Sequence, residues 1–130
     1  LGVNDLGNAG NYVSYMTNIA PTLKSKNCKL FYMSVNPINS TMITKAGRGA
    51  RTEAQVREFN SKIRSGLSLD YKYIDMSSVL MKKGYGTNTS YNGTDADSDD
   101  GLHYTTKTFK RTYYYCITYL NTGSINASYY

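Results

Sequence analysis

The sequence feature that most constrains the fold is an apolar run over residues 28–35, which ends at Asn36-Pro37. Its residues, Cys-Lys-Leu-Phe-Tyr-Met-Ser-Val, are nearly all apolar, as expected of a central parallel strand that is buried on both faces. A second short segment, residues 71–76, also predicts a strand. Parallel strands need crossover connections, which are usually helices. The run therefore predicts an α/β domain.

Helical patterns surround these two strands. Residues 11–20 predict a helix, which Pro21 should kink or reset because proline lacks an N–H and clashes with the preceding turn. Thr52 and Gln55 form a capping box for the most secure helix, which ends near Gly66. Its expected buried positions are Val56, Phe59 and Ile63, and its expected ion pairs are Glu53 with Arg57 and Glu58 with Lys62.

Two further helices are expected after the second strand. Residues 77–81 predict a short one. Thr105 or Thr106 can cap a final helix with an apolar stripe at the 3.6-residue period. The residues of that stripe, which we expect to be buried, are Phe109, Tyr113, Cys116, Ile117 and Leu120.

A polar segment over residues 38–51 follows the first strand and carries Lys45, Arg48 and Arg51. In an α/β sheet such a segment leaves the carboxyl end of a strand, where ligands bind. It is a candidate for part of a substrate-binding rim, and a mobile surface loop is an equally good interpretation.

The chain has a single histidine, His103, and Asp100 stands three positions before it. Histidine is the side chain best suited to move a proton near neutral pH, and a carboxylate can fix its tautomer and stabilise its charged form. A lone histidine in a glycine-containing loop can equally be an ordinary surface residue. A second stretch, Gly-Val-Asn-Asp at residues 2–5, favours the catalytic interpretation.

Together the two stretches resemble the SGNH (GDSL-type) hydrolase superfamily, whose third block is Gly-x-Asn-Asp and whose fifth is Asp-x-x-His. The segments between them follow the family's order of helix, strand, helix and strand. The resemblance implies a three-layer α/β/α sandwich of flavodoxin-like type. It also implies that His103 is the general base, that Asp100 orients it, and that the Asn4 side chain donates to the oxyanion hole.

Blocks one and two, which hold the nucleophilic serine and an oxyanion glycine, are not in this sequence. We therefore expect residues 1–120 to be the C-terminal part of a single domain that lacks its N-terminal strands. Residues 1–5 would end a buried strand, and 121–130 would be a tail of unknown role. The missing N-terminal segment would be a partner, and the chain alone would be inactive. Ser68 echoes the missing motif, but a helix precedes it and a strand follows, which predicts a loop residue.

The resemblance implies a serine esterase or acylhydrolase. Few exposed aliphatic residues flank the site, so we expect a small acyl group, such as that of an O-acetylated carbohydrate, rather than a lipid chain. The alternative is a catalytically inactive SGNH-like carbohydrate-binding or surface-interaction module, which would account for 14 tyrosines without a tryptophan. This composition is also typical of extracellular or cell-surface proteins. We expect the protein to have such a location in a bacterium.

Other partners are not expected. The net charge of +6 comes from 15 scattered Lys and Arg residues without a nucleic-acid motif. No apolar run is long enough to span a membrane. Asp95, Asp97 and Asp99 resemble a calcium loop, but its glycine falls one place late and its closing glutamate is missing, so neither a metal nor a cofactor is predicted.

Two cysteines, Cys28 and Cys116, are far apart and have no CxxC partner, which argues against a zinc site. They can form one disulfide or remain as two buried thiols, of which the second is the default. Neither is expected to be catalytic.

Overall fold

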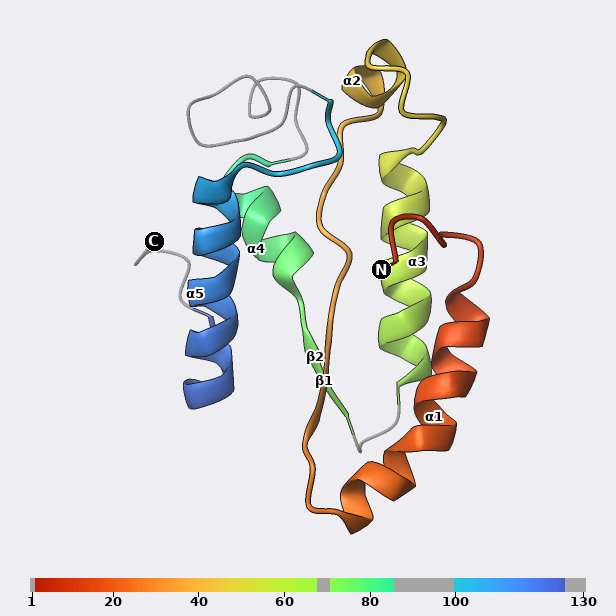
Figure 1. The fold of residues 1–130 in the computed structure, drawn as a ribbon, viewed down its shortest axis with the longest axis vertical. Helices are drawn as coiled ribbons and strands as arrows, with labels where there is room; N and C mark the ends of the chain where they lie inside the picture. Colours follow the sequence, from red (N-terminus) through yellow and green to blue (C-terminus); the bar gives the residue numbers. More distant parts are fainter. Residues whose placement is uncertain (1, 68–70, 86–99, 126–130) are drawn as a thin grey trace. The chain divides into compact units, whose positions relative to one another are not determined.

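The computed structural model describes residues 2–67, 71–85 and 100–125, and it is a mixed α/β protein (Figure 1). Two compact units, each discussed by itself, divide the chain: the first comprises Leu1–Val35 and Ala54–Asp75, and the second Asn36–Glu53 and Met76–Tyr130. The elements are α1 (Ala9–Ser25), β1 (Leu30–Met33), α2 (Ser40–Lys45), α3 (Glu53–Gly66), β2 (Tyr71–Ile74), α4 (Met76–Lys82) and α5 (Thr106–Thr122).

A two-stranded parallel sheet lies in the first unit. The register pairs Leu30 with Tyr71 and continues to Met33 with Ile74. The predicted parallel pairing is thus confirmed. The expected burial of β1 on both faces is wrong, because β1 is only partly covered and Met33 is 39% exposed. Among the described residues, each strand pairs with one other strand.

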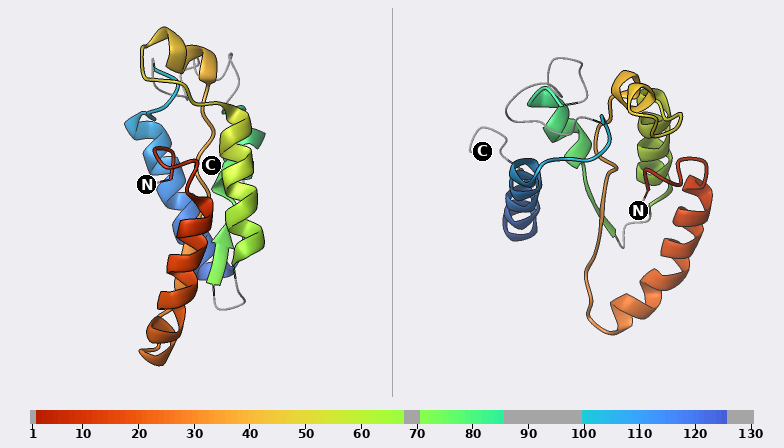
Figure 2. Two further views of the ribbon diagram at one scale, coloured as in Figure 1. Left: turned by 90° about the vertical axis from the view of Figure 1, so that its right-hand side faces the viewer. Right: turned by 45° about the horizontal axis from the view of Figure 1, so that its top comes forward.

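Helices α1 and α3 of the first unit lie side by side (Figures 1 and 2). The rings of Tyr12 and Phe59 meet edge to face with centroids 5.6 Å apart. Gly66 allows a close approach, because a Cβ there would lie 2.7 Å from a methyl group of Val13. α1 is not reset at Pro21 but continues to its end at Ser25.

The most secure helix prediction is confirmed by α3. Its buried stripe is Val56, Phe59 and Ile63, each at most 3% exposed. Glu58 forms the expected ion pair with Lys62, with 2.6 Å between Oε1 and Nζ. Glu53 also accepts hydrogen bonds from the backbone N–H and the hydroxyl of Ser40.

Asn60, on the buried side of α3, holds the chain where it leaves β1. Its Oδ1 accepts from the N–H of Val35 at 2.8 Å, and its Nδ2 donates to the carbonyl of Val35 at 2.9 Å. Both residues are buried. One side-chain amide therefore provides hydrogen-bond partners for both the N–H and the carbonyl of Val35, which lies beyond the paired residues of β1.

Replacing Asn60 with leucine is expected to destabilise the protein by about 3 kcal/mol, because two buried backbone groups lose their partners at roughly 1–3 kcal/mol each. Urea unfolding followed by circular dichroism measures the change. Lys62→Gln, which removes an exposed ion-pair partner on the same helix, is the control and should cost less than about 0.5 kcal/mol. Equal effects of the two substitutions would show that the amide of Asn60 has no special role.

The second unit contains α2, α4 and α5. The segment 38–51, expected to be without helix, contains α2, because Asn39 caps a helix by accepting from the N–H of Met42 at 3.0 Å. The short helix expected over 77–81 is present as α4, with Met76 and Leu80 fully buried. Thr105 caps α5 as predicted.

The buried face of α5 differs from the predicted one. Thr108, Thr112 and Tyr115 are its buried residues, one position before members of the predicted stripe. In that stripe Phe109 is 58% exposed and Tyr113 is 61% exposed, so the expectation that they are buried is wrong. Ile117 and Leu120 are exposed too, and Cys116 is half-buried. The hydroxyl of Thr108 has a hydrogen-bond partner on this face, whereas the buried hydroxyl of Thr112 has none among the described residues.

Candidate active site

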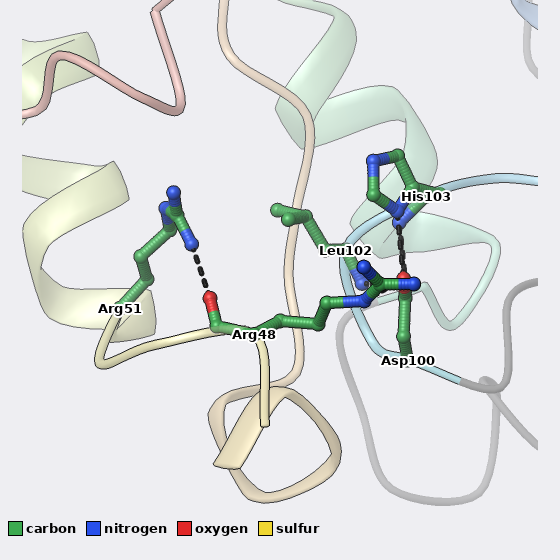
Figure 3. A network of polar contacts seen from close by, with 5 residues as sticks. All are labelled: Arg48, Arg51, Asp100, Leu102 and His103. Carbon is green, nitrogen blue, oxygen red and sulfur yellow. Dashed lines mark hydrogen bonds and ion pairs between the residues drawn. The ribbon is translucent and has the colours of Figure 1, made fainter. Parts of the chain in front are cut away.

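Asp100 and His103 lie in one short turn of the second unit, before α5 (Figure 3). Oδ2 of Asp100 is 2.7 Å from Nδ1 of His103. Oδ1 of Asp100 accepts the backbone N–H groups of Leu102 at 3.0 Å and of His103 at 2.9 Å. The Asp-x-x-His spacing therefore gives the two carboxylate oxygens different partners. Oδ1 bonds to the backbone of the turn, and Oδ2 bonds to the imidazole.

This contact decides which nitrogen of His103 can take part in chemistry. With Nδ1 facing a carboxylate, the ring proton is on Nδ1 and Nε2 has a free lone pair. The side chain of His103 is 68% exposed, whereas that of Asp100 is 14% exposed. Nε2 can therefore take a proton from a hydroxyl group of a bound molecule, and the carboxylate stabilises the resulting imidazolium.

Gly101 fixes this turn against the start of α2. Its carbonyl accepts from the N–H of Asn39 at 2.9 Å, and its φ is +72°. A Cβ at this position would lie 2.5 Å from the carbonyl oxygen of Asn39 and 2.8 Å from the Cβ of Met42. Glycine is thus needed for both the backbone conformation and the close approach.

The residue after the candidate base anchors the other side of the turn. The hydroxyl of Tyr104 donates to the carbonyl of Pro37, and its ring packs edge-on against Tyr85 with centroids 5.7 Å apart. Tyr85 is 2% exposed, and its hydroxyl is 3.1 Å from Oγ1 of Thr108 and accepts from Arg111 at 3.0 Å. This buried tyrosine links the end of α4 to the first turns of α5.

Arg48 completes the site, although the sequence did not connect it with Asp100. Its Nε is 3.4 Å from Oδ2 of Asp100, the oxygen that also binds His103. Arg51 donates to the carbonyl of Arg48 at 2.6 Å. The segment predicted as a candidate substrate rim thus contributes a cation to the Asp100–His103 pair. The sequence placed Arg48 in this rim, but no spacing in the sequence predicts its contact with Asp100, because the two residues are far apart along the chain.

Asn4, the third predicted site residue, is exposed in the first unit. It lies in a turn in which the N–H of Asp5 donates to the carbonyl of Gly2 at 2.9 Å. The expected strand over residues 1–5 is therefore wrong for the described residues 2–5. Gly2 has a φ of +94°, and a Cβ there would lie 2.5 Å from a methyl group of Val35, so the motif's glycine permits this packing.

The remaining sequence candidates lie elsewhere. Ser68 and the aspartates Asp95, Asp97 and Asp99 fall outside the described residues. Within residues 2–67, 71–85 and 100–125, no group of three or more His, Cys, Asp or Glu side chains is arranged to hold a metal ion.

The two cysteines are free thiols in the structure. Cys28 is exposed in the turn between α1 and β1, so the prediction of two buried thiols is wrong for this residue. Cys116 is half-buried in α5, and burial raises the pKa of its thiol. A raised pKa reduces the fraction of reactive thiolate at neutral pH.

Comparisons with known proteins give no match: no protein-family model, curated protein or solved structure matches the chain. The resemblance to SGNH hydrolases therefore rests on the two motifs and the order of the elements. Among the described residues, no helix is both long enough and apolar enough to cross a bilayer.

Proposed function

We propose that this chain is the part of an SGNH-type serine esterase that carries the general base. The observation that supports the proposal best is the 2.7 Å contact between Oδ2 of Asp100 and Nδ1 of His103, which leaves Nε2 on an exposed ring. The substrate is a small acyl ester, such as that of an O-acetylated carbohydrate. The proposal includes a complete three-layer α/β/α sandwich of flavodoxin-like type and an extracellular or cell-surface location in a bacterium.

The proposed reaction has two steps. A serine supplied by a segment outside these 130 residues attacks the ester carbonyl, its proton moves to Nε2 of His103, and the resulting oxyanion accepts a hydrogen bond from the side chain of Asn4. The imidazolium, stabilised by Asp100, protonates the departing alcohol. Water then attacks the acyl-serine with His103 again as base, which releases the acid and restores the serine.

A catalytically inactive carbohydrate-binding module is the second candidate. The observation that favours it is the exposed aromatic surface of α5, where Phe109, Tyr113 and Tyr114 are each more than half exposed. Aromatic side chains are enriched where one face of a protein meets a partner. Such a module would bind glycans and leave their esters intact.

A fluorophosphonate probe, which reacts with activated serines, separates the two candidates in the full-length protein. The esterase proposal predicts covalent labelling at one serine, identified by mass spectrometry, together with hydrolysis of p-nitrophenyl acetate. His103→Ala should abolish the labelling because the serine is no longer activated.

Ser68→Ala is the matched control and should label like the wild type, because Ser68 is predicted to be a loop residue. An unlabelled wild-type protein that binds acetylated glycans without hydrolysing them would overturn the esterase and support the binding module. Labelling that Ser68→Ala abolishes would contradict the assignment of the nucleophile.

A further inference from the structure

The segment after α2 places Arg48 at the candidate base. Residues 41–52 include Lys45, Arg48 and Arg51 and no acidic residue. Arg48 reaches Asp100, and Arg51 donates to the carbonyl of Arg48. Figure 3 shows the Arg48 side chain extended toward Asp100, and Arg51 beside the carbonyl of Arg48 on the side away from Asp100.

The backbone around Arg48 is held in place. The N–H of Arg48 donates to the carbonyl of Ile43 at 3.0 Å, and the N–H of Gly47 donates to that of Thr44 at 3.1 Å. Gly47 and Gly49, on either side of Arg48, have φ values of +66° and +88°. These hydrogen bonds and glycine conformations hold the loop against the end of α2, and they thereby fix the backbone position of Arg48.

The contact with Asp100 engages only part of the Arg48 guanidinium. The ion pair with Asp100 involves Nε at 3.4 Å, while 58% of the side chain is exposed. A guanidinium has five N–H donors in a planar fork that fits two oxygens of an oxyanion. The terminal amino groups of Arg48 can therefore bind an anion of the substrate while Nε stays at Asp100.

The exposed guanidinium of Arg48 next to the base favours an anion over a neutral group. Asp100 carries one negative charge, which Arg48 balances, and the side chain of Asp100 is largely buried at 14% exposure. The same segment carries two more basic residues, Lys45 and Arg51, and Glu53 follows it. An oxyanion that binds the exposed part of the Arg48 guanidinium would lie next to the Asp100–His103 pair.

We infer that the ester substrate carries an oxyanion group, a carboxylate, sulfate or phosphate, close to the scissile bond, and that Arg48 binds it. This inference rests on the proposed esterase function, because it names the class of substrate that the same site binds. For an acetylated carbohydrate, it selects an acidic sugar over a neutral one.

The test compares two acetyl esters in the full-length protein: an O-acetylated methyl glucuronoside and the same compound with its carboxylate methylated. Wild-type kcat/KM should be about 10- to 100-fold higher for the anionic ester, the scale of a charge-assisted bidentate contact. This ratio should fall as salt is raised. An acetylated glucoside 6-sulfate, run in parallel, distinguishes carboxylate from sulfate recognition.

Variants assign the preference to a residue. Arg48→Gln should bring the ratio of the two kcat/KM values to about one, whatever its effect on turnover itself, and Arg48→Lys should restore part of it because the charge returns without the fork. Lys110→Gln removes an exposed charge from α5 of the same unit and should leave the ratio unchanged. A ratio near one in the wild type overturns the inference while the esterase stands.

A binding measurement keeps the two proposals separate. Isothermal titration with methyl glucuronoside and with its uncharged methyl ester needs no turnover. Preferential binding of the acid that Arg48→Gln abolishes, in a protein that hydrolyses no ester, would overturn the esterase and support the anion site. Equal affinity for acid and ester would overturn the anion site.

Discussion

Replacing His103 with alanine is expected to lower kcat toward p-nitrophenyl acetate by a factor on the order of 10⁴ in the full-length protein, because the serine of the proposed esterase would lose its general base. The assay reports burst and steady-state rates of p-nitrophenol release. Circular dichroism of the variant should match the wild type, since the side chain is 68% exposed. Turnover within tenfold of the wild type would show that His103 is not the base.

Asp100→Asn should be nearly as severe, for a reason that lies in the geometry of the turn. The amide oxygen must take the place of Oδ1, which accepts the N–H groups of Leu102 and His103. The amide NH₂ then faces Nδ1 of His103 and donates to it, so that the ring proton moves to Nε2 and the base is blocked. We expect a loss on the order of 10³ to 10⁴, with the fold intact.

The proposed role of Asn4 in the oxyanion hole predicts a smaller loss of kcat. Asn4→Ala should cost on the order of 10² to 10³ in kcat, the scale of one oxyanion donor. An Asn4→Ala loss as large as that of His103→Ala would indicate a structural role for Asn4, because a single donor does not account for such a factor.

Gly101→Ala is expected to damage both stability and activity. The added Cβ would lie 2.5 Å from the carbonyl oxygen of Asn39, which is backbone and cannot move aside cheaply, and the φ of +72° disfavours any L side chain. Strain and overpacking together should destabilise the protein by about 3 kcal/mol, and the displaced turn should lower kcat at least tenfold. Thermal unfolding and ester hydrolysis measure the two effects.

Gly123→Ala is the matched control. Gly123 ends α5 with a φ of +74°, but a Cβ there meets nothing within 4 Å. It therefore isolates the cost of the left-handed conformation, about 1 kcal/mol, and should leave kcat unchanged. If Gly101→Ala were no more harmful than Gly123→Ala, the close approach of the turn to α2 would have no energetic importance.

The sequence alone determined features that depend on short spacings. The stripe of Val56, Phe59 and Ile63 follows from the helical period, and its burial agrees with the prediction. The pairing of Asp100 with His103 likewise needs only one short turn, because the carboxylate bonds to the backbone of the same turn. Local geometry fixes such contacts whatever surrounds them.

Only the tertiary structure decided features that join distant segments. Arg48 contacts Asp100 because Gly101 docks against the start of α2, and no spacing in the sequence encodes that approach. On the buried face of α5, Tyr85, distant in sequence, gives Thr108 a hydrogen-bond partner, whereas Thr112 is buried without one among the described residues. Hydrophobic periodicity predicts which face is apolar, but the segments that pack against a helix decide which face is buried.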